Sequence, residues 1–211
     1  MSDRKKKDTA PLYSRNEKPL NNTYPELAES TASLSPKDFI ADGEIVAFDG
    51  KLTSFSKLQK RMQVMDPEKA RHLKPKVYLY LFDMVYYDGY DLTNLSLTER
   101  KKILKEKLSW NDPVRYTSHI RESGKEYYAQ ACKKGWEGII AKNGRSTYKH
   151  TRSRDWLKFK CTNGQELVIG GFTEPQRARI GFGALLVGFY HDDKLLYAGK
   201  AGAGPMPISM P

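Results

Sequence analysis

One apolar run, from Val77 to Tyr87, constrains the fold of this chain more than any other segment. Its sequence is Val-Tyr-Leu-Tyr-Leu-Phe-Asp-Met-Val-Tyr-Tyr, and Asp88-Gly89 supplies a turn directly after it. Because side chains alternate between the two faces of a strand, a run that is apolar on both faces is typical of a central strand covered on both sides. We therefore expect a sheet with this segment at its centre.

Local patterns predict further strands and helices around this segment. Strands are expected at residues 39–48, 51–53, 138–142 and 156–161, and helices at residues 54–65, 96–108 and 125–134. The first helix is amphipathic, with Phe55 and Met62 among the apolar residues at helical spacing. Ser54 and Ser96 are the candidate N-caps of the first two helices, and Gly135 suits the position just after the third.

The chain divides by pattern into three parts. Residues 1–11 are charged and polar and end in Pro11, which predicts a disordered leader. Residues 12–163 hold the elements above and form the main domain. Residues 164–211 contain three short strand-like runs, near 167–172, 184–190 and 195–198, which predict a second, all-β unit. Residues 202–211 contain three prolines without alternation, too little to complete a barrel.

The charge balance is strongly positive. The chain has 36 Lys and Arg residues against 25 Asp and Glu residues, a formal net charge of +11. This balance favours an anionic partner, and nucleic acid is the first candidate. Many basic proteins bind no DNA, so the motifs must decide between these alternatives. The hydrophobic fraction of 39% predicts a folded core.

Cysteine usage and hydropathy bear on the compartment. Cys132 and Cys161 are too few for a framework of several disulfide bridges, which fits a reducing compartment. No apolar run approaches the roughly 18 residues of a membrane span, and no apolar stretch follows the basic N-terminus as in a secretory signal. We expect a cytoplasmic protein with no membrane partner. The four histidines are scattered without ligand-like spacing, so we assign them no metal.

Two acids lie on one face of the strand expected at residues 39–48. Alternation places Asp42 and Glu44 on the same face as Val46. A carboxylate in an apolar face is costly unless it meets a cation, a metal ion or a hydroxyl-bearing ligand. The alternative is a strand end whose acids simply face water, and this segment alone leaves both open.

Charged residues also bracket the two later strands of the main domain. Strict alternation places Glu137 and Lys142 on opposite faces, so both reach one ligand only if Glu137 sits in the turn before its strand. Lys158 and Lys160 share one face, and paired ammonium groups on a sheet suit a polyphosphate. The basic loop at residues 143–154 invites phosphate contacts. The alternatives are a surface acid and base in the first case, and an edge strand protected by lysines in the second.

These three segments, in this order and together with Ser14-Arg15-Asn16 and Leu81-Phe82-Asp83, resemble the nucleotidyltransferase motifs of ATP-dependent DNA ligases. The resemblance covers about residues 12–201 and is strongest to the ligase domain of bacterial end-joining ligase D. It implies an α+β fold, an ATP-grasp-like nucleotidyltransferase (adenylation) domain with mainly antiparallel sheets, followed by the start of an OB-fold β-barrel. The implied function is the ATP-dependent sealing of nicks or ends in duplex DNA during repair or recombination.

The resemblance also implies a role for each matching residue, with ATP and Mg²⁺ (or Mn²⁺) as cofactors. Glu44 and Glu137 would hold the metal ion, and Phe82 would stack on adenine. Arg15 would contact ribose or phosphate, Lys158 and Lys160 would bind the α-phosphate region, and Lys142 would support the phosphate side of the pocket. Arg177 and Arg179 would reach the DNA backbone. The alternatives are a core aromatic for Phe82 and a solvated charged turn for the two arginines.

One family motif is missing from this sequence. ATP-dependent DNA ligases attach AMP to the lysine of a Lys-x-Asp-Gly motif upstream of Ser14-Arg15-Asn16, and the nearest imitation, Lys6-Lys7-Asp8-Thr9, lacks the glycine. We reject Lys6 as the nucleophile because a lysine on a loose leader forfeits fixed in-line geometry. The distal basic motif expected after Gly199-Lys200-Ala201-Gly202 is also absent. The resemblance thus predicts a ligase truncated at both ends, with no catalytic nucleophile of its own.

Three functions remain open on the sequence. In the first, the chain takes part in ligation, with a separate polypeptide supplying the missing strands and lysine, or with DNA that is already adenylated. In the second, it is a non-catalytic module that binds nucleotide or DNA through the same basic surfaces. In the third, it is a truncated gene remnant with no activity.

Overall fold

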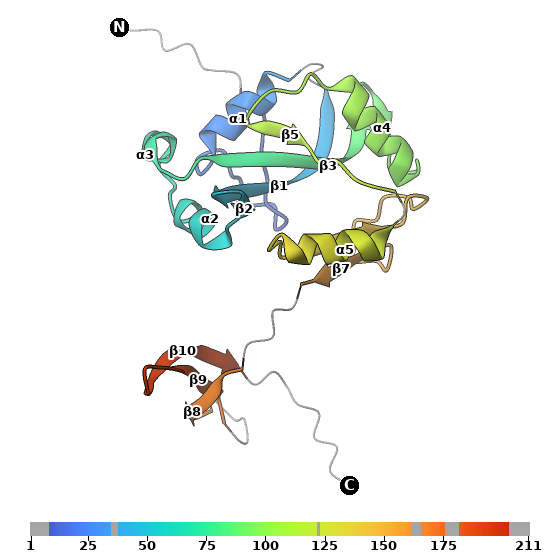
Figure 1. Cartoon of the computed structure of the whole chain (residues 1–211). Coiled ribbons are helices and arrows are strands. Elements are labelled where there is room, and N and C mark those ends of the chain that lie inside the picture. Colours follow the sequence, from blue (N-terminus) through green and yellow to red (C-terminus); the bar gives the residue numbers. More distant parts are fainter. Residues whose placement is uncertain (1–8, 35–37, 122, 162–165, 176–181, 203–211) are drawn as a thin grey trace, which may run out of the picture. The chain divides into compact units, whose positions relative to one another are not determined.

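The computed structural model describes residues 9–34, 38–121, 123–161, 166–175 and 182–202. The chain forms two compact units, of which the first ends at Cys161 and the second begins at Thr162. The boundary expected from the sequence lies between residues 163 and 164. Figure 1 shows the elements of both units.

The helices and strands follow one another in a mixed order. The helices are α1 (Pro25–Ala32), α2 (Phe55–Met62), α3 (Pro67–His72), α4 (Leu97–Lys107) and α5 (Gly124–Lys133). The strands are β1 (Phe39–Asp49), β2 (Leu52–Thr53), β3 (Val77–Tyr87), β4 (Tyr90–Asp91), β5 (Val114–Tyr116), β6 (Gly138–Lys142), β7 (Trp156–Lys160), β8 (Val168–Phe172), β9 (Ala184–His191) and β10 (Lys194–Gly202).

The first unit is built around a five-stranded sheet with β3 at its centre. The strand order is β2-β1-β3-β4, and β5 also pairs with β3. The strands of this sheet pair antiparallel except for β3 with β5. The apolar run of the sequence is therefore the central strand, as predicted, and the α+β fold with mainly antiparallel sheets is confirmed.

One face of β3 forms the core of this unit. Figure 1 shows α1 and α4 on the same side of the β1 and β3 pair. The core brings together Val77, Leu79 and Leu81 of β3, Leu27 of α1 and Leu104 of α4, each at most 7% exposed. Burial of such aliphatic side chains contributes about 1.5–3 kcal/mol each to folding.

The opposite face of β3 is aromatic and only half-buried. It carries Tyr78, Tyr80 and Phe82. The prediction that both faces are covered holds only in part for this face, because cations rather than an apolar layer lie over these rings. The guanidinium of Arg115 is 4.1 Å from the Tyr78 ring centroid, and the ammonium of Lys142 is 4.0 Å from the Phe82 ring centroid. We call this half-buried surface the open aromatic face of β3.

The predicted helix caps are confirmed. The Ser54 side chain accepts a hydrogen bond from the backbone N–H of Lys57 at the start of α2. Ser96 and Glu99 form a reciprocal capping box at the start of α4. Gly135 follows α5 with φ of +74°, a left-handed conformation that glycine adopts without strain.

Helix α2 buries a different face from the one that its apolar pattern predicts. Phe55 and Met62 are 68% and 50% exposed, whereas Arg61 is 1% exposed. The Arg61 guanidinium donates to the carboxylate of Glu26 at 2.8 Å and to the carbonyl of Thr23 at 3.0 Å. A buried cation is stable only with such partners, and helical periodicity cannot reveal them.

The remaining strands of the first unit form a two-stranded antiparallel hairpin, β6 with β7, on which α5 packs through the rings of Tyr128 and Phe159. A disulfide joins Cys132 of α5 to Cys161, with 5.3 Å between their Cα atoms. The sequence analysis favoured a reducing compartment and did not predict this disulfide. Residues that are 29 positions apart meet only through the fold, so the sequence carried no signal for the pair.

The expected leader is shorter than residues 1–11. The N–H of Ala10 donates to the carbonyl of Ala28 at 3.0 Å, and the amide of Asn21 donates to the carbonyl of Ala10 at 2.8 Å. These bonds tie residue 10 to the first unit. Residues 1–8 lie outside the described part of the chain. Among the helices that the structure describes, none is both long and apolar enough to cross a membrane.

The second unit contains an antiparallel three-stranded sheet in the order β10-β9-β8. Its strands fall where the three strand-like runs were predicted. The assignment of this sheet to the start of an OB-fold stays a prediction. Most of the proline-rich end, residues 203–211, lies outside the described residues.

Candidate functional site

The candidate site lies where β3 meets the β6 and β7 hairpin. The ammonium of Lys142 is 4.0 Å from the ring centroid of Phe82 and 3.5 Å from that of Trp156. The two rings meet edge to face, with centroids 5.7 Å apart. Lys142 and Trp156 are direct partners across the hairpin, so the pairing of β6 with β7 positions both against Phe82.

An irregularity in β3 sets the position of Phe82. Asp42 pairs with Asp83 and Gly43 pairs with Leu81, which leaves Phe82 without a partner in β1. Such bulges bend a strand and redirect a side chain next to a site. The carbonyl of Phe82 also accepts a hydrogen bond from the Lys101 ammonium at 3.4 Å. Sequence alternation cannot predict this bulge.

The surroundings of Lys142 disfavour its charged form. Burial, followed by the nearby charge of Lys101, lowers the pKa of the Lys142 ammonium to about 8. Asp83 and Asp42 act in the opposite direction. A substantial fraction of Lys142 is therefore neutral in mildly alkaline solution.

Asp42 has a hydroxyl partner within the protein itself, which the sequence did not predict. The Tyr148 hydroxyl donates to the Asp42 carboxylate at 2.6 Å. Burial, followed by this hydrogen bond, raises the pKa of Tyr148 well above its ordinary value. The bond ties the basic loop at residues 143–154 to the edge of the site. Sequence reasoning missed Tyr148, which stands alone among polar residues.

A buried ion pair supports the same loop. Arg100 of α4 donates to both carboxylate oxygens of Asp83, at 2.8 and 2.9 Å, and neither side chain is exposed. Arg100 also donates to the carbonyls of Leu95 and Ser146. Asp83 is thus engaged in structure rather than available to a ligand. Arg100 was not among the predicted residues because a basic residue in a helix gives no sign of its burial.

Glu137 and Lys158 lie together at the other end of the hairpin. The Lys158 ammonium donates to the Glu137 carboxylate at 2.7 Å, and this bond lowers the pKa of Glu137. Lys160 also lowers that pKa by its charge. Glu137 directly precedes β6, the position it needs to act on the same side as Lys142. The side chains of Glu137 and Lys158 are 70% and 50% exposed, so a ligand can reach both.

Glu44 and Arg15 are less defined as site residues. Glu44 is exposed and pairs with Tyr80 along the sheet. Arg15 is exposed in a tight turn that the Ser14 N–H closes by donating to the carbonyl of Lys18. Within the described ranges, neither side chain makes a hydrogen bond, an ion pair or a ring contact with Phe82. Arg177 and Arg179 lie outside the described residues.

The carboxylates do not form a ready metal site. Over the part of the chain that the structure describes, no three His, Cys, Asp or Glu residues are grouped so that they could hold a metal ion. Glu137 is occupied by Lys158. Magnesium is commonly held by one or two carboxylates plus substrate phosphates, so a metal ion here would depend on a bound nucleotide.

Comparison with known proteins gives a family for the first unit. Residues 2–160 match the family model described as "ATP dependent DNA ligase domain". The chain is 37% identical to the "Multifunctional non-homologous end joining protein LigD" of Pseudomonas aeruginosa, covering 92% of this chain and 23% of that protein. It is 31% identical to a "DNA ligase" of Caldivirga maquilingensis, covering 94% of this chain and 36% of that protein.

Solved structures agree with this match. The mycobacterial DNA ligase D complexed with ATP and MES aligns with a TM-score of 0.60 at 30% identity, covering 91% of this chain and 59% of that chain. The ligase domain from M. tuberculosis LigD aligns with a TM-score of 0.56 at 29% identity, covering 93% of this chain and 61% of that chain. The chain spans 23% of the Pseudomonas relative and 24% of its mycobacterial counterpart in Mycolicibacterium smegmatis.

Proposed function

This chain belongs to the ATP-dependent DNA ligase family, as its ordered motifs predicted, and we propose that it binds the adenylate of an activated DNA end and takes part in sealing that end. One observation carries the proposal. Phe82, Lys142 and Trp156, from strands far apart in the sequence, meet at one point on the open aromatic face of β3. The relatives named for DNA ligation and end joining support a nicked or broken duplex as the substrate. We propose a cytoplasmic location for a protein that acts on this substrate.

Adenine binding would use the face of Phe82. A purine stacked on this ring would take the space that the Lys142 ammonium occupies, 4.0 Å from the centroid. The Lys142 side chain would therefore move from the ring toward the phosphate groups, where its charge is favourable. Base stacking on an aromatic side chain contributes about 1–3 kcal/mol to binding.

Phosphate binding would use the cations beside Glu137. Lys158 and Lys160 are on one face of β7, and Lys158 is held by Glu137 in the structure. An exposed ion pair of this kind is worth about 0–1 kcal/mol, so a phosphate group can replace Glu137 as the partner of Lys158 at little cost. Arg15 as a ribose or phosphate contact, and Arg177 and Arg179 as DNA contacts, stay predictions.

Mg²⁺ or Mn²⁺ is the expected cofactor beside ATP. Glu44 and Glu137 would be its carboxylate ligands, with phosphate oxygens completing the shell. As they stand, these residues fit only such a nucleotide-dependent site, so no step of the reaction is assigned to the metal.

The sealing step balances without a nucleophile from this chain. The 3′-hydroxyl oxygen of one DNA end forms a bond to the 5′-phosphorus of the adenylated end, and the anhydride bond to AMP breaks. The hydroxyl proton passes to solvent, and AMP leaves with its phosphate charge opposite Lys158 and Lys160. Formation of the adenylate needs a lysine that this sequence does not offer. We assign that step to a separate polypeptide that supplies the missing strands and lysine.

Sealing of a pre-adenylated nick by the full chain tests the proposal. We expect sealed product, and we expect Phe82→Leu to lower kcat/KM about thirtyfold, which corresponds to the middle of the range for one lost stacking contact. Tyr90→Leu is the matched control, because Tyr90 is 71% exposed on β4. Binding of the adenylated nick without sealing would replace the proposal by the non-catalytic module.

A second assay tests the division of labour. Incubation of the chain with ATP labelled in the α-phosphate should give no covalent label. Label on the isolated chain would contradict the assignment of adenylation to another polypeptide.

A further inference from the structure

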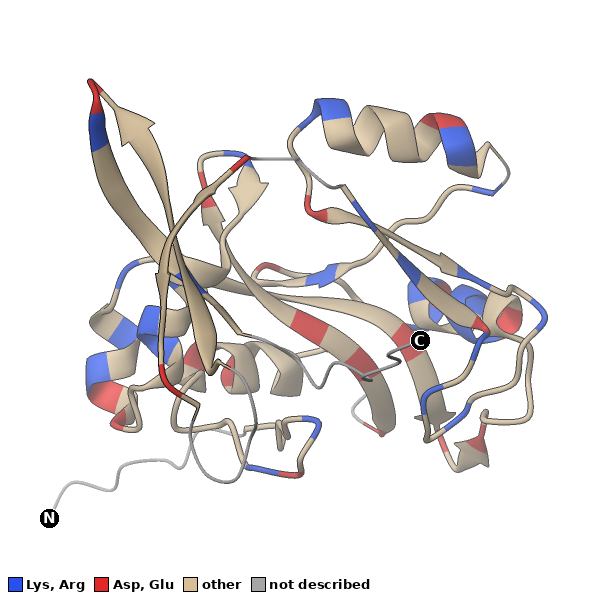
Figure 2. Ribbon diagram, turned by 90° about the horizontal axis from the view of Figure 1, so that it is seen from below, with Lys and Arg blue, Asp and Glu red and all other residues tan. Residues whose placement is uncertain are grey.

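A basic groove lies between α2 and the segment that joins α3 to β3. It encloses about 630 Å³, and five of its lining residues are Lys or Arg: Lys57, Lys60, Arg71, Lys74 and Lys76. Leu73 and Pro75 are its apolar lining residues, and no Asp or Glu of the described segments lines it. Figure 2 shows Lys and Arg as blue segments along the ribbon, including those of α2 and α3. This groove holds a surplus of positive charge.

The surplus comes from three of the five cations. Lys57 is neutralised by Asp49 at 2.9 Å, and Arg71 donates to both carboxylate oxygens of Glu29. Lys60, Lys74 and Lys76 are exposed. Among the described residues, none of these three has an acid within ion-pair distance. Three unneutralised ammonium groups on one concave surface attract a ligand with several negative charges.

The groove is separate from the nucleotide site but connected to it by one strand. Lys76 directly precedes Val77, the first residue of β3, and Phe82 lies five positions further along the same strand. At about 3.3 Å per residue, the groove and the adenine site are roughly 17 Å apart. Figure 1 shows α2 and α3 at the end of β3 where the strand begins. Base pairs of B-DNA are about 3.4 Å apart along the axis, so 17 Å corresponds to about five base pairs.

We propose that this groove binds the phosphodiester backbone of duplex DNA about five base pairs from the end that is sealed. The inference rests on the proposed function, because it takes the DNA end to lie at the Phe82 site. Lysine binds phosphate as a point charge without demanding one geometry, which suits a contact that is independent of base sequence. The groove fixes the direction in which the duplex leaves the active site.

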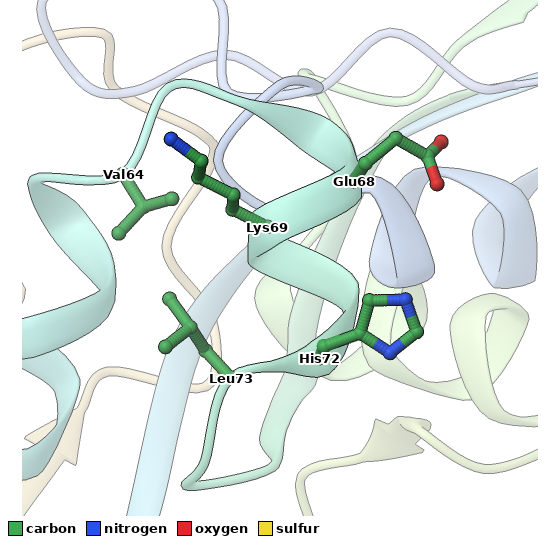
Figure 3. Close-up of a pocket in the computed structure, with 5 residues that line it drawn as sticks. All are labelled: Val64, Glu68, Lys69, His72 and Leu73. Carbon is green, nitrogen blue, oxygen red and sulfur yellow. The ribbon is translucent and has the colours of Figure 1, made fainter.

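The neighbouring surface argues for a backbone rather than an acidic peptide. An apolar hollow of about 610 Å³ lies against α3. In Figure 3, Lys69 and Leu73 extend from one side of α3 and His72 from the other. An acidic peptide anchored in this hollow would bring its carboxylates beside Glu68, which also lines the hollow, and like charges repel. The apolar lining of the groove itself is limited to Leu73 and Pro75. Phosphate groups need only the cations.

Salt-dependent binding of nicked duplex by the full chain tests the inference. The groove variant replaces Lys60, Lys74 and Lys76 with Gln. The control variant replaces Lys102, Lys105 and Lys107 with Gln, because these three exposed lysines of α4 carry the same total charge. A plot of the logarithm of the DNA-binding constant against the logarithm of the salt concentration has a negative slope. The loss of three phosphate contacts should make this slope less steep by about 2 to 3, whereas the control variant should have the slope of the parent chain.

Duplex length makes the test specific. The groove variant and the parent should differ on a duplex that extends ten base pairs from the nick on each side. They should bind alike when the arm that extends toward the groove is cut to three base pairs, because the duplex then no longer reaches the groove. Each arm is shortened in turn, and only one of the two should have this effect. Equal slopes for the groove and control variants, or a difference that does not depend on length, would overturn the inference. Loss of binding to a polyglutamate peptide with unchanged duplex binding would overturn it too.

The two proposals can fail independently. If pre-adenylated nicks are not sealed but the groove variant still loses length-dependent binding, the groove stands and the sealing function falls. If nicks are sealed and the groove variant binds like the parent, the sealing function stands and the groove falls. An unchanged cooperative melting transition of both variants shows that neither result comes from unfolding.

Discussion

Arg100 and Asp83 form an ion pair in which neither side chain has exposed surface, and two hydrogen bonds of 2.8 and 2.9 Å join them. The same guanidinium donates to the carbonyl of Ser146 in the basic loop. This pair therefore connects α4, the central strand and the loop whose Tyr148 bonds to Asp42. The candidate site therefore depends on a contact made outside it.

Replacement of Arg100 by Met should strongly destabilise the first unit. The change leaves the Asp83 carboxylate buried without its cation, which lowers the free energy of unfolding by about 3–5 kcal/mol. Urea unfolding followed by tryptophan fluorescence measures the loss. Lys57→Met is the control, because its pair with Asp49 is 40% and 66% exposed and is worth about 0–1 kcal/mol. An equal decrease in the free energy of unfolding in both variants would show that the buried pair contributes no more to stability than the exposed pair.

The lowered pKa of Lys142 predicts a rise of stability with pH. In the folded chain Lys142 titrates at about 8, against an ordinary value of 10.5. Between these values the unfolded chain binds more protons than the folded chain, so the free energy of unfolding increases as pH rises from about 8 toward 10. Below pH 8 both states are protonated and this slope disappears. Above pH 10 the raised pKa of Tyr148 acts in the opposite direction.

Urea unfolding at pH 7, 8, 9 and 10 tests this prediction. The parent should gain stability across the upper three values. Lys142→Met should lose that gain and should be more stable than the parent at pH 7, where the parent must keep a charged ammonium in a buried position. Parallel pH profiles for the two proteins would contradict the prediction.

Helix α2 offers a direct comparison of its apolar and charged residues. Phe55→Ser should change the free energy of unfolding by less than about 0.5 kcal/mol, because Phe55 is 68% exposed. Arg61→Ala should cost at least about 3 kcal/mol, because it removes the cation that pairs with Glu26 inside the fold. Thermal or urea unfolding ranks the two variants. The opposite ranking would show that the apolar residues of α2, and not Arg61, contribute most to stability.

Local signals in the sequence were sufficient for much of the fold. The apolar run at Val77–Tyr87, the cap at Ser54 and the capping box at Ser96 depend on neighbouring residues, and each is where the sequence predicted it. Motif order also predicted the family, although the roles of the individual site residues stay predictions.

Contacts between distant segments account for the differences. The ammonium of Lys142 reaches Phe82 because the β6 and β7 hairpin packs against β3. Arg100 and Arg61 are buried charged residues, and each is paired with an acid and with backbone carbonyls from distant segments. The bridge from Cys132 to Cys161 likewise depends on how α5 packs on the hairpin. Periodicity and composition hold no information on such pairs.

Gly138 is the position at which a single methyl group should disturb the candidate site most. A Cβ atom there would lie 2.0 Å from the carbonyl oxygen of Phe159 and 2.8 Å from the Cα of Lys160, and φ is +152°. Both neighbours are backbone atoms of β7, so Gly138→Ala must push the hairpin apart or strain its own backbone. We expect a loss of at least about 3 kcal/mol in the free energy of unfolding. We also expect the pKa of Glu137 to return toward its ordinary value, because Glu137 moves away from Lys158. NMR titration of the carboxylate measures that second effect.

Gly124→Ala is the matched control: its Cβ would meet nothing within 4 Å, and alanine in α5 should stabilise the chain by up to about 1 kcal/mol. A Gly138→Ala protein with the parent's stability and an unchanged Glu137 pKa would mean that the close approach of β6 and β7 does not hold this end of the site together.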